Sequence, residues 1–269
     1  MRICLLRSGS SGNCTFIEHG NTRVLLDAGG FTQAGFLGIL AEMNAALAHI
    51  DAVVVSHLHS DHLNHAALSL FSRNSIPVWV HAENVSVLKS SLQKKSRFPL
   101  SVNPFHETPF FIKDIELIPF LVDHDAQKTT SGFKFRGVGT HGSSASYATD
   151  LGCFPNALLP HFVNSRVVIL EANHDSDLLW NNPLRPYFHK KRVASDFGHL
   201  SNAQAAEALV KICGASNTHP ESIMLSHLSK DHNSPQRAIE YIGNELKKCG
   251  YGGRLLSAYR DRKAEVVEI

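Results

Sequence analysis

Short apolar runs separated by polar turn residues recur along the whole chain. Many span four to six residues and are rich in β-branched side chains, as in Ala52–Val55, where three of the four residues are valine. Runs of this length and composition favour strands over helices. The pattern predicts strands at Ile3–Leu6, Cys14–Ile17, Arg23–Leu26, Ala52–Val55, Ile76–Val80, Ile115–Phe120, Ser131–Phe135, Ser144–Ala148, Val167–Leu170, Ser222–Leu225, Leu255–Ala258 and Glu265–Val267.

Helical segments are expected between these runs, and two of them begin with capping signals. Ser201 and Gln204 have the spacing of a capping box, and Ser234 precedes a proline that suits the first helical position. No linker or low-complexity tract interrupts the alternation, which predicts an α/β chain of one domain, residues 1–269, with helices outside two sheets. The expected helices are Gln33–Leu47, Ala82–Gln93, 201–213 and 234–248.

One stretch of sequence occurs twice. Residues 53–62 are VVVSHLHSDH and residues 223–232 are IMLSHLSKDH, so each copy is a buried strand followed by Ser-His-Leu-x-x-Asp-His. The repetition suggests two equivalent halves that each bring a histidine from a strand end to one shared cleft. Because the match is short, coincidence is the competing interpretation.

The composition is that of an ordinary globular protein, with one unusual count. The 269 residues carry a net charge of +2, which neither favours nor excludes nucleic acid as a partner. No apolar run approaches the ~18 residues of a membrane span, and the five cysteines show no CxxC spacing, so we expect reduced thiols, no membrane partner and a cytoplasmic location. The 17 histidines point to metal sites with nitrogen and oxygen ligands.

Four potential metal ligands lie within six residues directly after the Ala52–Val55 run. In an extended segment His57, His59 and Asp61 project on one side, and a turn can return His62 to them. Imidazoles with a carboxylate can hold two divalent ions, and water between two such ions is acidified and placed for attack. The alternative is that any one of these histidines is a surface or hydrogen-bonded core residue.

This run resembles the signature of the metallo-β-lactamase superfamily, and companion motifs follow in the order of that family. Asp27, in LLDAG, resembles its first motif, although the residue also suits a turn at a strand end. His124 resembles the third motif, with Asp123 and Asp125 as competitors for the role. Asp150 and His227 resemble the fourth and fifth motifs.

The resemblance implies an αββα sandwich, two mixed sheets flanked by helices, with its site at one edge. Asp27 would orient the histidine loop, as metal-bound imidazoles usually require. The implied ligands are His57, His59, His124 and Asp150 for one ion, and Asp61, His62, Asp150 and His227 for the other. Zn²⁺, Mn²⁺ and Fe²⁺ all suit such ligands.

Four further runs resemble the YycJ-like bacterial branch, described as DNA exonucleases acting from 5′ ends. They are residues 8–13, 171–175, 198–202 and 226–233. The resemblance implies phosphodiester hydrolysis by a hydroxide that bridges two metal ions, with Asp61 holding and deprotonating the water. DNA is the favoured partner.

Several residues of these runs are candidates for contacts with substrate or ligands. Ser10, Ser11 and Asn13 could present donors to phosphate, or simply form a flexible turn. His199, ahead of a helix, could protonate a leaving oxygen or bind phosphate, or could face solvent beside the helix cap. Glu171 and His174 are candidate hydrogen-bond partners of the metal ligands. Lys230 and His232 could contact the scissile or an adjacent phosphate, although Lys230 could also be a solvated charge.

Two basic stretches add modest support for nucleic acid. Arg185, His189, Lys190, Lys191 and Arg192 are interleaved with Tyr187 and Phe188, a combination that single strands favour, and Lys89, Lys94, Lys95 and Arg97 form the second stretch. Either could be ordinary surface. A narrow pocket would instead favour a small-molecule hydrolase acting on a cyclic phosphodiester, thioester or lactone. Absence of tightly bound metal would favour a non-catalytic binding module.

Overall fold

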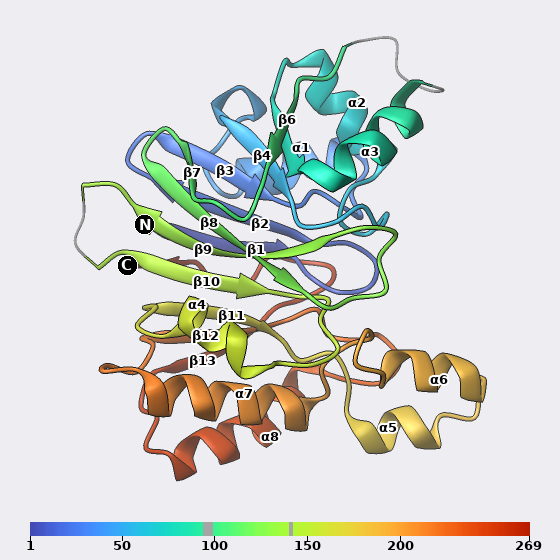
Figure 1. The fold of residues 1–269 in the computed structure, drawn as a ribbon, viewed down its shortest axis with the longest axis vertical. Coiled ribbons are helices and arrows are strands. Elements are labelled where there is room, and N and C mark those ends of the chain that lie inside the picture. Colours follow the sequence, from blue (N-terminus) through green and yellow to red (C-terminus); the bar gives the residue numbers. More distant parts are fainter. Residues whose placement is uncertain (94–98, 140–141) are drawn as a thin grey trace.

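Two seven-stranded sheets pack face to face, with helices on the outside of both (Figure 1). The computed structural model describes residues 1–93, 99–139 and 142–269. The first sheet has the order β14-β1-β2-β3-β4-β5-β6, and the second has the order β13-β12-β11-β10-β9-β8-β7. The predicted αββα sandwich of two mixed sheets is confirmed.

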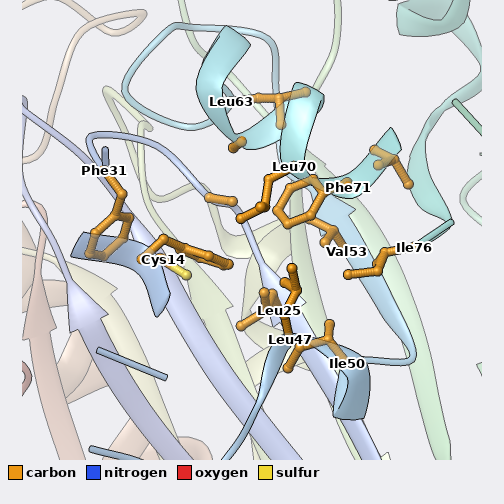
Figure 2. Close-up of a cluster of buried hydrophobic side chains, with 14 of the residues drawn as sticks. Cys14, Leu25, Phe31, Leu47, Ile50, Val53, Leu63, Leu70, Phe71 and Ile76 are labelled. Carbon is orange, nitrogen blue, oxygen red and sulfur yellow. The ribbon is translucent and has the colours of Figure 1, made fainter. Parts of the chain in front are cut away.

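The N-terminal half builds nearly all of the first sheet. Its strands are β1 (Arg2–Arg7), β2 (Cys14–His19), β3 (Thr22–Leu26), β4 (Ala52–Val55), β5 (Val78–His81), β6 (Val102–Phe105) and β14 (Val267–Glu268). The outer face is covered by α1 (Gln33–Ala41), α2 (His65–Arg73) and α3 (Val85–Gln93), with short 3₁₀ turns η1 (Leu47–His49) and η2 (Ala82–Asn84). Figure 2 shows this outer core, where Leu70 and Phe71 of α2 pack toward Leu25 and Val53 of the sheet.

The C-terminal half builds the second sheet. Its strands are β7 (Phe110–Ile112), β8 (Ile115–Val122), β9 (Thr130–Gly137), β10 (Ser144–Ala148), β11 (Val167–Glu171), β12 (Ser222–Ser226) and β13 (Arg254–Ser257). The turn η3 (Asn156–Leu158) and the helices α4 (Leu159–Phe162), α7 (Asn202–Ala215) and α8 (Pro235–Lys248) belong to this half, and the helices cover the outer face. The short helices α5 (Ser176–Asn181) and α6 (Tyr187–Val193) lie side by side at one corner of the molecule (Figure 1).

Alternation along the central strands divides the core into three layers. In β4, Val53 and Val55 face the outer helices while Ala52 and Val54 face the second sheet. Because successive side chains of a strand point to opposite faces, a strand covered on both sides is apolar at every position. This is why the run was recognisable as a strand in the sequence.

Strand direction decides where the functional loops lie. In the first sheet β3, β4 and β5 are parallel, and in the second β10, β11 and β12 are parallel. Strand β8 is antiparallel to β9, which is antiparallel to β10, so β8 runs in the direction of β10. The loops after β8, β10, β11 and β12 therefore leave from the same edge of their sheet.

The predicted elements differ from the observed ones in a few places. The helix expected over Gln33–Leu47 ends at Ala41, because Asn44 adopts a left-handed backbone (φ 55°) and a separate 3₁₀ turn follows. The segment Ala82–Gln93 divides into η2 and α3. Strands β6 and β7 and helices α2, α4, α5 and α6 were not predicted. The capping box at Ser201 and the start at Ser234 are confirmed.

Two expectations drawn from composition can be compared with the described residues. All five cysteines are free thiols. Among the residues that the structure describes, no helix combines the length and the apolar character needed to cross a membrane. Of the second basic stretch, Lys94, Lys95 and Arg97 lie outside the described residues.

Candidate metal centre and active site

Loops from both sheets bring the seven predicted metal ligands together at one edge of the sandwich. His57 follows β4 in the first sheet, and the loop after it contributes the rest of the HLHSDH run. From the second sheet, His124 follows β8, Asp150 follows β10 and His227 follows β12. Residues up to 170 positions apart in the chain thus meet across the interface of the two sheets.

The donor atoms form overlapping groups around Asp150. Within each of four groups the donor atoms lie no more than 4.8 Å apart. The groups are His57 with His59 and His124, His57 with His62 and Asp150, Asp61 with His62 and His227, and Asp150 with Glu171, His199 and His227. Asp150 Oδ1 lies 3.6 Å from His124 Nε2 and 3.5 Å from His227 Nε2, and Asp150 Oδ2 lies 3.0 Å from His62 Nε2. Its carboxylate therefore lies between the two predicted ligand sets.

Several of these nitrogens have no partner within the protein. The Nε2 atoms of His57, His124 and His227 are buried and make no hydrogen bond among the described residues. A buried polar atom without a partner is destabilising, and protein structures seldom retain one without a reason. Three such nitrogens that point toward one carboxylate fit divalent cations that prefer nitrogen and oxygen ligands. The residues present therefore fit the metal ions that the family resemblance implies.

Hydrogen bonds connect Asp27 to the histidine loop. Its fully buried carboxylate accepts hydrogen bonds from the backbone N–H and the hydroxyl of Ser56, both at 2.8 Å, and from His62 Nδ1 at 2.7 Å. Burial alone would lower the pKa of His62, but the carboxylates of Asp150 and Asp27 outweigh it and raise that pKa well above its usual range. With Nδ1 committed to Asp27, His62 Nε2 faces the other donors.

Glu171 links His227 to His199. Its Oε1 accepts hydrogen bonds from His227 Nδ1 at 2.7 Å and His199 Nδ1 at 2.8 Å, and its Oε2 accepts two backbone N–H groups at 3.2 Å. Burial raises the pKa of Glu171, yet the two histidines more than offset it and lower the pKa to about 2. The carboxylate is therefore ionised and fixes both rings with Nε2 directed away from it.

The backbone at the site is held in unusual conformations. Asp27, Asp150 and His227 adopt left-handed φ angles of 60°, 58° and 53°. Such conformations are sparsely populated by residues other than glycine and cluster at functional sites. Close approach also explains the glycine of the LLDAG motif, because a Cβ added at Gly29 would lie 1.8 Å from the carbonyl oxygen of Asp61.

A cavity of about 270 Å³ opens beside the metal ligands. It is lined on one side by His199, Asn173 and His232, and on the other by residues of α6 and the segment before it. The side chain of His199 is 20% exposed, so it reaches this space while Glu171 holds it from behind. A larger cavity of about 570 Å³ lies between β9, β10 and α4, and none of the predicted ligands lines it.

The structure brings only some of the candidate substrate residues to this cavity. Ser10 lines it, and Asn13 Nδ2 lies 2.9 Å from His62 Nε2. His232 lines it too, with its Nε2 bonded to Asn182. Two candidates, Ser11 and Lys230, are exposed and make no side-chain hydrogen bond among the described residues.

His174 is buried behind Glu171, with no partner for its Nδ1 in the described part of the chain, and its pKa is lowered to about 4, chiefly by burial. Asn173, which was not singled out from the sequence, donates to the carbonyl of His227 at 2.8 Å. Its position inside the run 171–175 was the available signal. Asp125 lines the cavity and pairs with Arg192, whereas the neighbouring His124 supplies the donor atom of the ligand group.

Comparison with known proteins finds one matching family and several similar sequences. The family model described as a beta-lactamase superfamily domain matches residues 22–232. Exodeoxyribonuclease WalJ of Streptococcus pneumoniae is 29% identical over 253 residues, which cover 93% of this chain and 90% of that protein. Exodeoxyribonuclease YycJ of Bacillus anthracis is 27% identical over 259 residues, covering 94% and 91%.

A solved structure shows the same fold. The metallo-beta-lactamase fold protein YhfI from Bacillus subtilis superposes with a TM-score of 0.70 at 16% identity, over 99% of both chains. At that identity the likeness concerns the fold alone. The match therefore supports the arrangement of sheets and helices described above.

Proposed function

This chain belongs to the β-lactamase superfamily and is a metal-dependent hydrolase, and from that premise we propose that it is a DNA exonuclease acting from 5′ ends with two divalent ions. Relatives named exodeoxyribonuclease match more than nine tenths of the chain, which supports DNA as the substrate. The observation that carries the proposal is the convergence of unpartnered imidazole nitrogens around Asp150 at an open edge.

The proposed ligand sets combine the overlapping groups of donor atoms with Asp150 as the shared residue. One ion would be held by His57, His59, His124 and Asp150, and the other by Asp61, His62, Asp150 and His227. Zn²⁺, Mn²⁺ or Fe²⁺ would acidify a water molecule there and offset negative charge on phosphoryl oxygens.

Asp61 is the proposed acceptor of the proton from the attacking water. Its side chain is 22% exposed, and its Oδ2 lies 3.5 Å from His227 Nε2 and 3.7 Å from His62 Nε2. Burial raises the pKa of Asp61, but these two histidines reverse the effect and lower it. The group is therefore an ionised carboxylate that can orient water and receive its proton.

His199 is the proposed donor to the leaving oxygen. Glu171 holds its Nδ1, which leaves Nε2 as the nitrogen available to substrate in the cavity. In this scheme the water oxygen forms a bond to phosphorus and the bond from phosphorus to the leaving sugar oxygen breaks. His199 acts in its doubly protonated form: Nδ1–H stays bonded to Glu171, and Nε2–H gives its proton to the leaving oxygen, which leaves a neutral ring. Asn173 and His232 line the same space and can hold the phosphate.

A small-molecule phosphodiesterase is the second candidate, because a cavity of about 270 Å³ also accommodates a compact ester. A binding module without catalysis is not supported, since all seven predicted ligands lie together.

The test is hydrolysis of DNA labelled at its 5′ or 3′ end, single- and double-stranded, with Mn²⁺, Zn²⁺ or chelator, beside bis-p-nitrophenyl phosphate. We expect metal-dependent, stepwise shortening from the 5′ end. Asp61→Asn should abolish it, whereas the exposed Glu207→Gln on α7 should not change it. Cleavage of the small ester alone would identify a small-molecule phosphodiesterase. Shortening from the 3′ end would overturn the polarity, and no metal-dependent cleavage would overturn the proposal.

A further inference from the structure

We propose that the segment containing α5 and α6 is a binding surface for single-stranded DNA, which leads an unpaired strand into the cavity beside His199. The surface is defined by Trp180, Leu184, Tyr187, Phe188 and Lys191 and is called the α5–α6 face below. Its path toward the metal ligands rests on the proposed nuclease function. The binding itself does not require catalysis.

Exposed apolar side chains are concentrated on this face. Among the described residues, ten large hydrophobic side chains are exposed, and four of them belong to this face: Trp180, Leu184, Tyr187 and Phe188. Leu184 is 86% exposed, Phe188 75% and Tyr187 65%. Such a concentration of exposed apolar side chains in one short segment is typical of an interaction surface.

Two aromatic rings of the face lie close to each other and to lysines of α6. The ring centroids of Trp180 and Tyr187 are 6.1 Å apart, and Lys191 Nζ lies 5.6 Å from the centroid of Tyr187. Lys190 Nζ donates to the carbonyl oxygen of Trp180 at 2.8 Å. Flat rings that alternate with ammonium groups offer stacking surfaces for bases and charges for the phosphates between them.

The other side of α6 forms a wall of the cavity. His189 and Arg192 line the cavity, together with Arg185 just before the helix. Arg185 pairs with Asp231, and Arg192 pairs with Asp125, the residue after His124. These two ion pairs attach the segment to the loops that carry the candidate site. One short helix therefore has the aromatic face on its outside and the cavity on its inside.

Charge favours a nucleic acid strand as the occupant. Arg185 and Arg192 are paired to carboxylates. Three other cations have no carboxylate at ion-pair distance among the described residues: Lys190, Lys191 and Lys230. His189 Nδ1 is buried at the cavity with no hydrogen-bond partner in the described structure, so it can receive or donate a bond to a ligand. Bases of a duplex are already stacked on each other, so rings that stack on bases select an unpaired strand.

Fluorescence anisotropy of labelled oligothymidine of about 15 nucleotides tests the proposal. The full-length, metal-loaded protein is used, and phosphorothioate linkages at both oligonucleotide ends resist hydrolysis. Tyr187→Ala and Phe188→Ala should each weaken binding roughly tenfold, as expected when a stacked base loses its partner. Tyr241→Ala removes another exposed aromatic side chain, on α8 and 45% exposed, and is the control that should bind as the wild type. Thermal melting checks that each variant is folded.

Tryptophan fluorescence gives a second readout. Trp180 is 43% exposed, whereas Trp79 stacks on Phe110 with centroids 5.0 Å apart. Oligothymidine should quench the emission, and Trp180→Phe should remove the quenching.

Three results would each overturn the inference and favour a protein partner for this face. They are unchanged affinity in the Tyr187→Ala, Phe188→Ala double variant, equal affinity for blunt duplex, and no binding of single strands. Binding that depends on the face in a protein that cleaves no DNA would leave the inference standing and refute the nuclease function. Cleavage of DNA together with unchanged affinity in the double variant would support the nuclease function and refute the inference about the α5–α6 face.

Discussion

The carboxylate of Glu171 provides the sharpest test of how the site is held together. Replacing it by glutamine keeps the shape of the side chain but removes the negative charge between His227 and His199. With its oxygen in the place of Oε1, the amide can still accept from both imidazoles, but without a negative charge. Its NH₂ group would then face the backbone N–H groups of Leu151 and Leu200, which lose their acceptor. Glu171→Gln should therefore lower both stability and metal affinity.

The size of the effect follows from the pKa of Glu171. A shift from 4.5 to about 2 corresponds to roughly 3 kcal/mol in favour of the ionised form, because one pKa unit is about 1.4 kcal/mol. For a chain of this size that loss lowers the melting temperature by on the order of 10 °C. Since the folded-state pKa is depressed, this stability is present above pH 4.5 and is lost as the pH falls toward 2.

The assay is thermal unfolding of the metal-free protein in chelator, followed by metal titration. Wild type and Glu171→Gln should differ most at neutral pH and converge below pH 4.5, and the variant should bind metal about 10- to 100-fold more weakly. Glu207→Gln, exposed on α7, is the matched control and should behave as the wild type. Equal melting temperatures at pH 7 for Glu171→Gln and wild type would refute the reasoning.

Three further predictions concern the same edge of the molecule. His199→Ala should reduce turnover about 100-fold or more while leaving bound metal, measured by mass spectrometry, nearly unchanged; equal loss of both would make His199 a metal ligand. Gly29→Ala should lower the melting temperature and metal content together, since its Cβ would lie 1.8 Å from the Asp61 carbonyl oxygen, and a normal variant would disprove that contact. Metal binding at pH 7 should release protons, detectable by calorimetry in two buffers. Burial lowers the pKa of His227, but Asp150, Asp61 and Glu171 raise it to about 10 in the metal-free protein, and the pKa of His62 is also raised. Both histidines must therefore lose a proton to bind metal. Binding heats that do not depend on the buffer would contradict this.

Local signals in the sequence were sufficient for most of the central elements. The valine run of β4 and the capping residues Ser201 and Ser234 act through neighbours in the chain, so they could be recognised without tertiary structure. Helices α5 and α6 were missed because they are only six and seven residues long and leave large apolar side chains in solvent. Only Leu179 of α5 is buried, and α6 buries no residue, so neither helix shows the repeated apolar positions of a core helix.

The repeated Ser-His-Leu-x-x-Asp-His stretch shows how far equal sequence can diverge in role. His57 and His227 each follow a buried strand of their sheet and both reach the ligand groups, as the repetition predicted. The later histidines differ. His62 is held between Asp27 and Asp150, whereas His232 bonds to Asn182 at the wall of the cavity. The surrounding loops, and not the repeated residues, make that difference.

The sequence alone determined the kind of chemistry, because His57, His59, Asp61 and His62 are close in the chain and lie together in any compact turn. Tertiary structure alone decided which distant groups join them. Parallel strand order brings Asp150 and His227 to the same edge, burial leaves their donor atoms without other partners, and Glu171 couples His227 to His199. Such convergence depends on contacts between residues far apart in sequence, whereas periodicity and capping record only the neighbours of each residue.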